Sequence, residues 1–104
     1  MIQLDENEIG SLTAEEFLQH KNQCLTQLKG DQPFDLLLDC RATLLDLADL
    51  ETIKNILETK GRILVIVVSK ADLDRWAMDW NVVPTLQEAH DFLAFERMQR
   101  DLGF

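Results

Sequence analysis

The chain has 104 residues and a mass of 12.0 kDa, which fits one domain over residues 1–104 and leaves no room for a second core. Hydrophobic residues make up 46% and charged residues 28%, the balance of a folded rather than a disordered protein. Nineteen acidic residues against ten basic ones give a net charge of −9. This charge argues against binding to nucleic acid or to an anionic membrane.

The first part of the chain predicts a strand, a helix and a second strand. Residues 2–4 are a weak strand candidate. Thr13 and Glu16 have the spacing of a capping box, and the apolar residues that follow at helical spacing predict one helix that ends at Gly30. Residues 34–40 predict a strand, and their three consecutive leucines indicate burial on both faces of a sheet.

The middle of the chain predicts a second helix and the clearest strand. Asp46 or Asp49 is expected to cap the helix, and Gly61 to follow its last turn. Residues 62–69 contain an unbroken, largely β-branched apolar run at 63–68, which is typical of a central strand in a parallel sheet.

The last part predicts two further helices around a short strand. Ser69 opens a pattern that predicts a short third helix up to about Trp80. Residues 81–83 are long enough for a short strand only. Thr85 then caps a fourth helix over residues 86–101. Alternating helices and strands predict an α/β fold with a small, mostly parallel sheet and about four helices.

Side chains in patterns typical of catalysis or metal binding are few. Ser11 and Ser69 lie outside any nucleophile motif, and the chain has no tyrosine. Cys24 and Cys40 have no metal-binding spacing, so we interpret them as small core residues in a reducing compartment. We therefore predict no enzyme activity, no catalytic residue, no metal and no cofactor. The start of the chain lacks the pattern of a secretory signal and the longest apolar run, residues 63–68, is too short to cross a bilayer, so we expect a cytoplasmic protein.

The fourth helix carries more apolar positions than one buried face requires. The surplus row consists of Phe95, Met98 and Leu102, and Phe104 continues it. We hypothesise that this row contacts a second copy of the chain or another protein. The alternative is that Phe95 and Met98 fold onto a hydrophobic lid made by Trp76 and Trp80.

Four short segments together resemble a STAS-type domain, the fold of anti-sigma factor antagonists and of the cytosolic domains of sulfate transporters. The first, Ile2–Glu15, is similar to a strand, a turn and the first helix of the family. The others are Leu36–Asp39, Gly61–Val65 and Val83–Ala89, which are similar to its central strand, its glycine-led strand and its closing strand and helix. The resemblance implies a STAS-like fold. It also implies a non-enzymatic protein-interaction or regulatory module, with the second helix and its preceding loop as the partner surface.

The chain departs from the family in the segment through which the family regulates the binding of its partner. The family opens its second helix with an Asp, two hydroxyl residues and a Gly, one serine of which is phosphorylated. Here Leu47, Ala48 and Asp49 follow Asp46, so we expect no such phosphoswitch; Thr43 is the hydroxyl nearby. The family's first antiparallel strand is expected to be missing, and its third helix to be shortened. The predicted partner-binding residues are Thr43, Asp46, Asp49, Phe95, Met98 and Leu102.

A second hypothesis is a domain that binds a small ligand or an anion, or an enzyme, at the carboxyl ends of the strands. Ligands of open α/β sheets bind at that edge. Its candidate residues are Asp39, Arg41, Lys70 and Asp72. A deep cleft containing both cations would favour this hypothesis, whereas a flat edge with an exposed Phe95 and Met98 would favour a protein partner.

Overall fold

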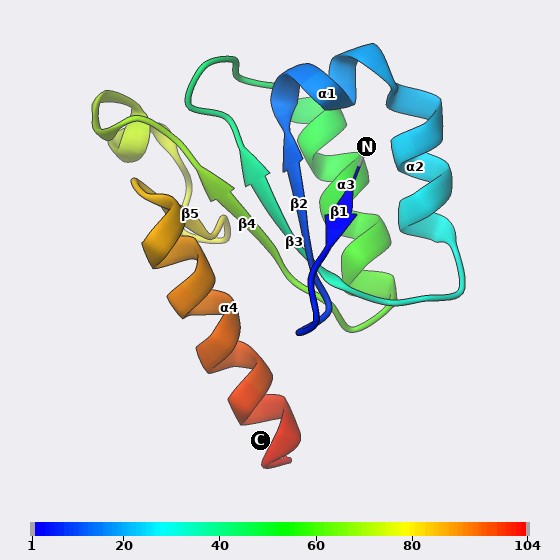
Figure 1. Cartoon of the computed structure of the whole chain (residues 1–104). Coiled ribbons are helices and arrows are strands. Elements are labelled where there is room, and N and C mark those ends of the chain that lie inside the picture. Colours follow the sequence, from blue (N-terminus) through cyan, green and yellow to red (C-terminus); the bar gives the residue numbers. More distant parts are fainter. Residues whose placement is uncertain (1, 104) are drawn as a thin grey trace.

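The computed structural model describes residues 2–103 and contains a five-stranded sheet with the order β1-β2-β3-β4-β5 (Figure 1). β1 is antiparallel to β2, and all other neighbouring strands are parallel. The predicted α/β fold with a mostly parallel sheet is confirmed. In chain order the elements are β1 (Gln3–Leu4), β2 (Ile9–Thr13), α1 (Ala14–Gln19), α2 (Lys21–Lys29), β3 (Asp35–Asp39), α3 (Leu47–Thr59), β4 (Leu64–Val67), the 3-10 helix η1 (Lys70–Arg75), β5 (Val82–Val83) and α4 (Leu86–Asp101).

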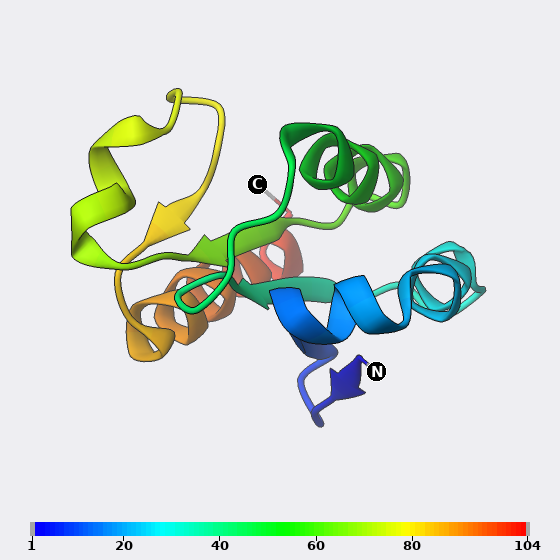
Figure 2. The ribbon, with the colours of Figure 1, turned by 90° about the horizontal axis from the view of Figure 1, so that it is seen from above.

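The sequential strand order decides which face of the sheet each helix covers. Connections between parallel strands are almost always right-handed, so strands added in one direction place all their connecting helices on one face. α1, α2 and α3 lie on this face, and α4, which follows the last strand, lies on the other (Figures 1 and 2). The far face of the sheet is therefore covered by α4.

The central strands are buried on both faces, as their unbroken apolar runs predict. Successive residues of β3 and β4 alternate between a larger core under α1, α2 and α3 and a smaller core under α4. The larger core takes Leu36, Leu38 and Ile66, and the smaller core takes Leu37, Val65 and Val67 together with Ala89 and Leu93 of α4.

The predicted helix ends are largely confirmed. The Thr13 hydroxyl accepts from the Glu16 N–H at 3.1 Å, and the Glu16 carboxylate accepts from the Thr13 N–H at 3.1 Å, which completes the capping box. The Thr85 hydroxyl accepts from the Glu88 N–H at 3.1 Å, and α4 has the predicted bounds. Gly61 follows α3 with a φ of 70°, a left-handed conformation that glycine adopts without strain.

The single helix expected up to Gly30 is wrong, because the chain breaks into α1 and α2 at His20 (φ −131°, ψ 41°). A straight helix would carry Lys21 on the same face as the buried Phe17, one turn further along. After the break the Lys21 ammonium lies 2.8 Å from the Asp49 carboxylate of α3. The break therefore keeps this charge out of the core and gives it a partner.

The third helix is shorter than expected: it is the 3-10 segment η1 and does not reach Trp80. The Ser69 hydroxyl donates to the Asp72 carboxylate at 3.0 Å instead of accepting from a backbone N–H, so the capping pattern is not realised. Trp76 is already extended (φ −100°, ψ 140°). Both tryptophans pack against the larger core, and this packing takes the place of a longer helix.

The strand candidate at residues 2–4 is confirmed as β1, and the expectation that an antiparallel first strand is missing is wrong. The turn after β1 explains the pairing. The Asp5 carboxylate accepts from the N–H groups of Asn7 and Ile9 at 2.8 and 3.0 Å, and Glu8 takes a left-handed φ of 62°. The turn returns the chain along β2.

A buried carboxylate joins the sheet to the second half of α4. Asp35, at the start of β3, accepts from the Ile63 N–H at 3.0 Å with one oxygen. Its other oxygen accepts from the Arg100 guanidinium at 2.5 Å, and the Arg62 guanidinium lies 3.9 Å away. A buried charge is tolerated only where it is paired and hydrogen-bonded, so this cluster fixes how α4 lies on the sheet.

We predict that Arg100→Ala lowers the free energy of unfolding by about 3 kcal/mol, because Asp35 loses its nearest cation while remaining buried. Urea unfolding at neutral pH measures this. Arg97→Ala is the control: Arg97 donates to the exposed Asn7 at 2.9 and 3.0 Å, and its loss should cost less than about 1 kcal/mol. Equal losses for the two variants would contradict the role of the buried pair.

Candidate functional site

An apolar groove lies where α3 begins, next to the segment between η1 and β5. Its volume is about 320 Å³. Two walls are formed by the indole rings of Trp76 and Trp80, which meet edge to face with centroids 5.8 Å apart and an interplanar angle of 70°. The Lys54 ammonium lies 4.7 Å from the centroid of the Trp80 ring and 3.4 Å from the Asp79 carboxylate. The groove, called the α3 groove below, is lined by Leu44, Leu45, Leu47, Leu50, Arg75, Trp76, Ala77 and Trp80.

Two leucines at this groove are exposed to solvent. The exposed fraction is 43% for Leu44 and 58% for Leu47, although both belong to a residue type that is usually buried. Met78, in the loop that carries the two tryptophans, is fully exposed. Sequence reasoning missed these side chains as site residues. The signal was the group of leucines at positions 44, 45 and 47, which surround Asp46 where a helix begins.

The predicted residues Thr43, Asp46 and Asp49 lie beside the α3 groove in sequence but have different surroundings. Thr43 is half-buried in the loop before α3. Asp46 occupies the N-cap position of α3 with no hydrogen bond from its side chain to the helix, and it is exposed. Asp49 pairs with Lys21 at 2.8 Å. Of the two acids, Asp46 is therefore the one whose charge faces solvent at the start of α3.

The four residues of the ligand hypothesis lie in two separate pairs. A hollow of about 380 Å³ at the carboxyl ends of β2 and β3 is lined by Thr13, Glu15, Asp39, Arg41 and Ala42. Lys70 and Asp72 do not line it; Asp72 lies in η1, where it accepts from Ser69 and faces Arg75 at 3.5 Å. Among the described residues, the hollow lined by Arg41 therefore does not include Lys70.

The guanidinium of Arg41 is held by its neighbour. Arg41 Nε and one terminal nitrogen donate to the two Asp39 carboxylate oxygens at 3.0 and 2.8 Å, and the Arg41 N–H adds a third bond at 3.1 Å. These bonds hold the pKa of the Asp39 carboxyl below its usual value and raise the pKa of Arg41. An anion entering the hollow would have to compete with Asp39 for this cation.

The apolar row of α4 faces solvent. The exposed fraction is 53% for Phe95, 53% for Met98 and 65% for Leu102, whereas Phe104 lies outside the described residues. Trp76 and Trp80 pack against the larger core, on the opposite face of the sheet from the core under α4. The alternative in which Phe95 and Met98 fold onto the tryptophan lid is therefore wrong.

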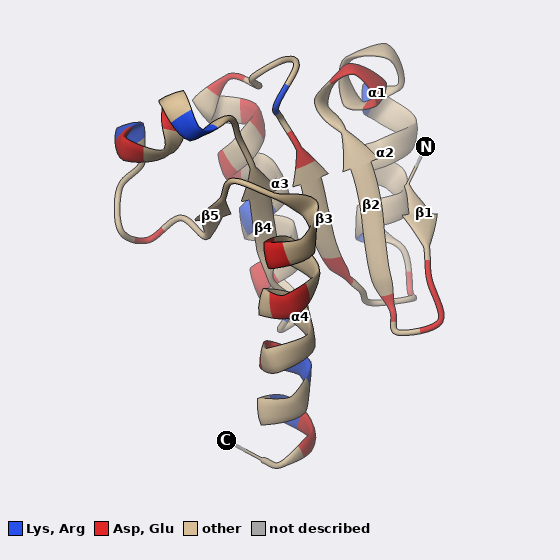
Figure 3. Cartoon of the chain, turned by 60° about the vertical axis from the view of Figure 1, so that its left-hand side comes forward, with Lys and Arg blue, Asp and Glu red and all other residues tan. Residues whose placement is uncertain are grey.

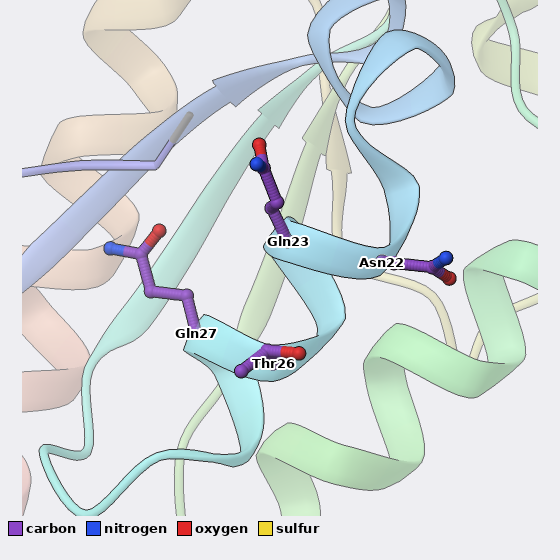
Figure 4. Close-up of a pocket in the computed structure, with 4 residues that line it drawn as sticks. All are labelled: Asn22, Gln23, Thr26 and Gln27. Carbon is purple, nitrogen blue, oxygen red and sulfur yellow. The ribbon is translucent and has the colours of Figure 1, made fainter.

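A shallow depression of about 470 Å³ lies along α2, lined by Asn22, Gln23, Thr26 and Gln27 (Figure 4). All four side chains come from one helix. Gln23 and Gln27 project from one side of α2, and Asn22 projects from the other (Figure 4). The Gln27 amide donates to the Ile2 carbonyl at 3.1 Å, so it already serves to hold the start of the chain against α2. The lining contains no ionisable group.

The predicted core cysteines are buried and free. Burial raises the pKa of the Cys40 thiol to about 11, and burial also raises that of Cys24, so both stay protonated near neutral pH. Within residues 2–103 no three His, Cys, Asp or Glu side chains are grouped in a way that would hold a metal ion. In the same residues no helix has the length and hydrophobicity needed to cross a membrane.

Comparison of the chain with protein-family models, with curated proteins and with solved structures finds no match. The resemblance to STAS-type domains therefore remains a prediction from the short segments that carry it.

We predict that the pKa of Asp39 returns to its ordinary value in Arg41→Ala. In the folded protein this pKa is depressed, so the stabilisation from the pair is present above the unfolded value of about 3.9 and is lost as the pH falls through the lower folded value. An NMR titration of the Asp39 carboxyl carbon measures this pKa in the natural chain and in Arg41→Ala. Arg41→Lys is the control and should give an intermediate value, because a single ammonium does not form the two-point contact. An unchanged Asp39 titration in Arg41→Ala would contradict this account.

Proposed function

We propose that the chain is a non-enzymatic protein-interaction and regulatory module, similar to the anti-sigma factor antagonists that its sequence resembles. Its partner is another protein, which binds at the α3 groove. One observation carries the proposal: the exposed Leu44 and Leu47 stand at a tryptophan-lined groove in the segment where the resembling family has its regulatory serines. The proposal places the protein in the cytoplasm, which free buried cysteines suit.

The physical basis is burial of apolar side chains. Covering an exposed leucine fully contributes about 1.5–3 kcal/mol, and Leu44 and Leu47 are each about half exposed before binding. The neighbouring tryptophans supply rigid aromatic walls of the kind that concentrates binding energy at the centre of an interface. A partner that inserts apolar side chains between them gains most of its affinity from this contact.

The charges around the groove select the partner. Asp46 is exposed at the start of α3, whereas Asp79 pairs with Lys54 and Arg75 of the groove wall pairs with Asp72. The charge that Asp46 adds beside the groove has the same sign as the net charge of −9 of the whole chain. Complementary charge speeds the encounter between two proteins and disfavours wrong partners. The proposed partner therefore presents an apolar segment flanked by basic residues.

Regulation at this surface differs from that of the resembling family. Leu47, Ala48 and Asp49 occupy the positions of the hydroxyl pair and glycine, so no serine is available there for phosphorylation. Asp46 and Asp49 keep a negative charge at the start of α3, where the helix dipole favours it. On this proposal the amount of partner, rather than phosphorylation of this segment, controls the complex.

The hypothesis of a small ligand or anion at the carboxyl ends of the strands has less support. Arg41 is engaged by Asp39, and the hollow beside it does not include Lys70. A thermal-shift series with phosphate and nucleotides separates the two hypotheses. A ligand at one hundred times its dissociation constant would add about 2.7 kcal/mol of stability, whereas a protein-interaction module shows no shift.

We predict that a photo-crosslinking residue in place of Leu47 captures one partner protein in the native host. The matched control is the same residue in place of Leu18 of α1, whose exposed fraction is 54% against 58% for Leu47. Leu44→Glu, placed in the Leu47 variant, should abolish the capture because it puts a charge at the groove. Mass spectrometry of the crosslinked bands measures the outcome. The same proteins captured at positions 47 and 18 would overturn the proposal.

A further inference from the structure

The second half of α4 turns its arginines, and not its apolar row, toward the end of the sheet. Arg100 reaches the buried Asp35, and Arg97 donates to Asn7 in the turn between β1 and β2. The two arginines fix the roll of the helix and turn the apolar row to solvent. This arrangement is the reverse of what burial of apolar area alone would favour, so the row is available for a contact outside the chain.

We propose that this row, Phe95, Met98 and Leu102, is the interface with a second copy of the chain, formed by two α4 helices that cross antiparallel near Met98. The three residues have the i, i+3, i+7 spacing of a helix–helix seam. A two-fold axis next to Met98 brings Phe95 of each copy against Leu102 of the other. In Figure 1 the second half of α4 extends past the end of the sheet, so two such ends can meet.

The charges along the same side of α4 select the antiparallel direction. Asp91 and Glu88 lie one and two turns before Phe95 and continue the line of the row. Acidic residues mark the first half of the helix in Figure 3. A parallel pair would set each of these acids against its own equivalent, whereas an antiparallel crossing near Met98 moves them to opposite ends of the contact. The opposed directions of the two helix dipoles add to this preference.

The surface beside the row can receive side chains of the second copy. A hollow of about 310 Å³ lies between α4 and the start of β2, and Met98 and Leu102 form part of its wall together with Ile9 and Ala94. Methionine is flexible and fills irregular gaps, so Met98 of the second copy suits this hollow. Three exposed side chains cover much less than the roughly 800 Å² per partner of a standard stable interface. The structure therefore assigns a reversible dimer that forms as the concentration rises.

Sedimentation equilibrium over a wide concentration range tests the dimer. The natural chain should pass from the monomer mass to twice that mass. Phe95→Glu should weaken dimer formation by at least about tenfold, whereas Leu18→Glu, at a site of matched exposure on the other face, should leave it unchanged. Both changes are at exposed positions, and thermal melting verifies that both variants fold. A monomer at every concentration, or equal effects of the two changes, overturns the proposal.

A cysteine at the crossing point tests the geometry. Cys24 and Cys40 are buried, so Met98→Cys introduces an accessible thiol at the proposed axis. Mild oxidation should link two copies of this variant through a disulfide, because residues on a two-fold axis face each other. The matched control Leu18→Cys should remain unlinked under the same conditions. Failure of the Met98→Cys variant to link, in a sample where sedimentation shows a dimer, overturns the contact near Met98.

Phe95→Cys tests the direction, because the antiparallel crossing sets Phe95 against Leu102 and separates the two introduced thiols. Linking of Phe95→Cys as efficient as that of Met98→Cys overturns the antiparallel crossing.

Discussion

The order of the strands is the constraint on which the rest of the structure depends. Every parallel strand pairs with the one before it in sequence, and right-handed connections then collect α1, α2, α3 and η1 against the larger core. The same face holds the α3 groove, because the start of α3 and the tryptophans between η1 and β5 both belong to connections that pack against the larger core. The opposite face has α4 as its cover and a smaller core. The two proposed contact surfaces therefore lie on opposite sides of one sheet and can be occupied at the same time.

The second determinant is the buried carboxylate of Asp35. A carboxylate at this depth requires a cation, and Arg100 is the residue of α4 that supplies it. The hydrogen bond from Arg100 to the Asp35 carboxylate sets the rotation of α4 about its own axis. The apolar row is exposed as a result, since its residues lie on the side of the helix turned away from Arg100. Polar contacts thus decide the orientation of α4, while apolar contacts of Ala89 and Leu93 hold it on the sheet.

Features encoded within a few neighbouring residues were predictable from the sequence. The doubly buried β3 and β4, the Thr13 and Thr85 caps and the bounds of α4 all follow from local patterns. The break at His20 was not predictable, because its advantage arises from Lys21 reaching Asp49 on another helix. The exposure of Phe95 was one of two alternatives that the surplus apolar positions left open, and the sequence could not decide between them because the choice depends on Arg100 and Asp35, which are 65 residues apart. The segment that begins α3 was found by resemblance, but the role of its leucines depends on tryptophans brought from beyond β4.

The contacts of Arg97 and Arg100 also have a consequence for how the chain folds. They join α4 to residues 90 and 65 positions earlier, whereas each strand pairs with its neighbour in sequence. Closing such long segments is entropically costly until the sheet exists to receive them. We therefore expect the hairpin and the successive strand–helix–strand units to assemble first and α4 to dock last. Until α4 docks, the far side of the nascent sheet is open to water, and this intermediate is the species most prone to aggregation.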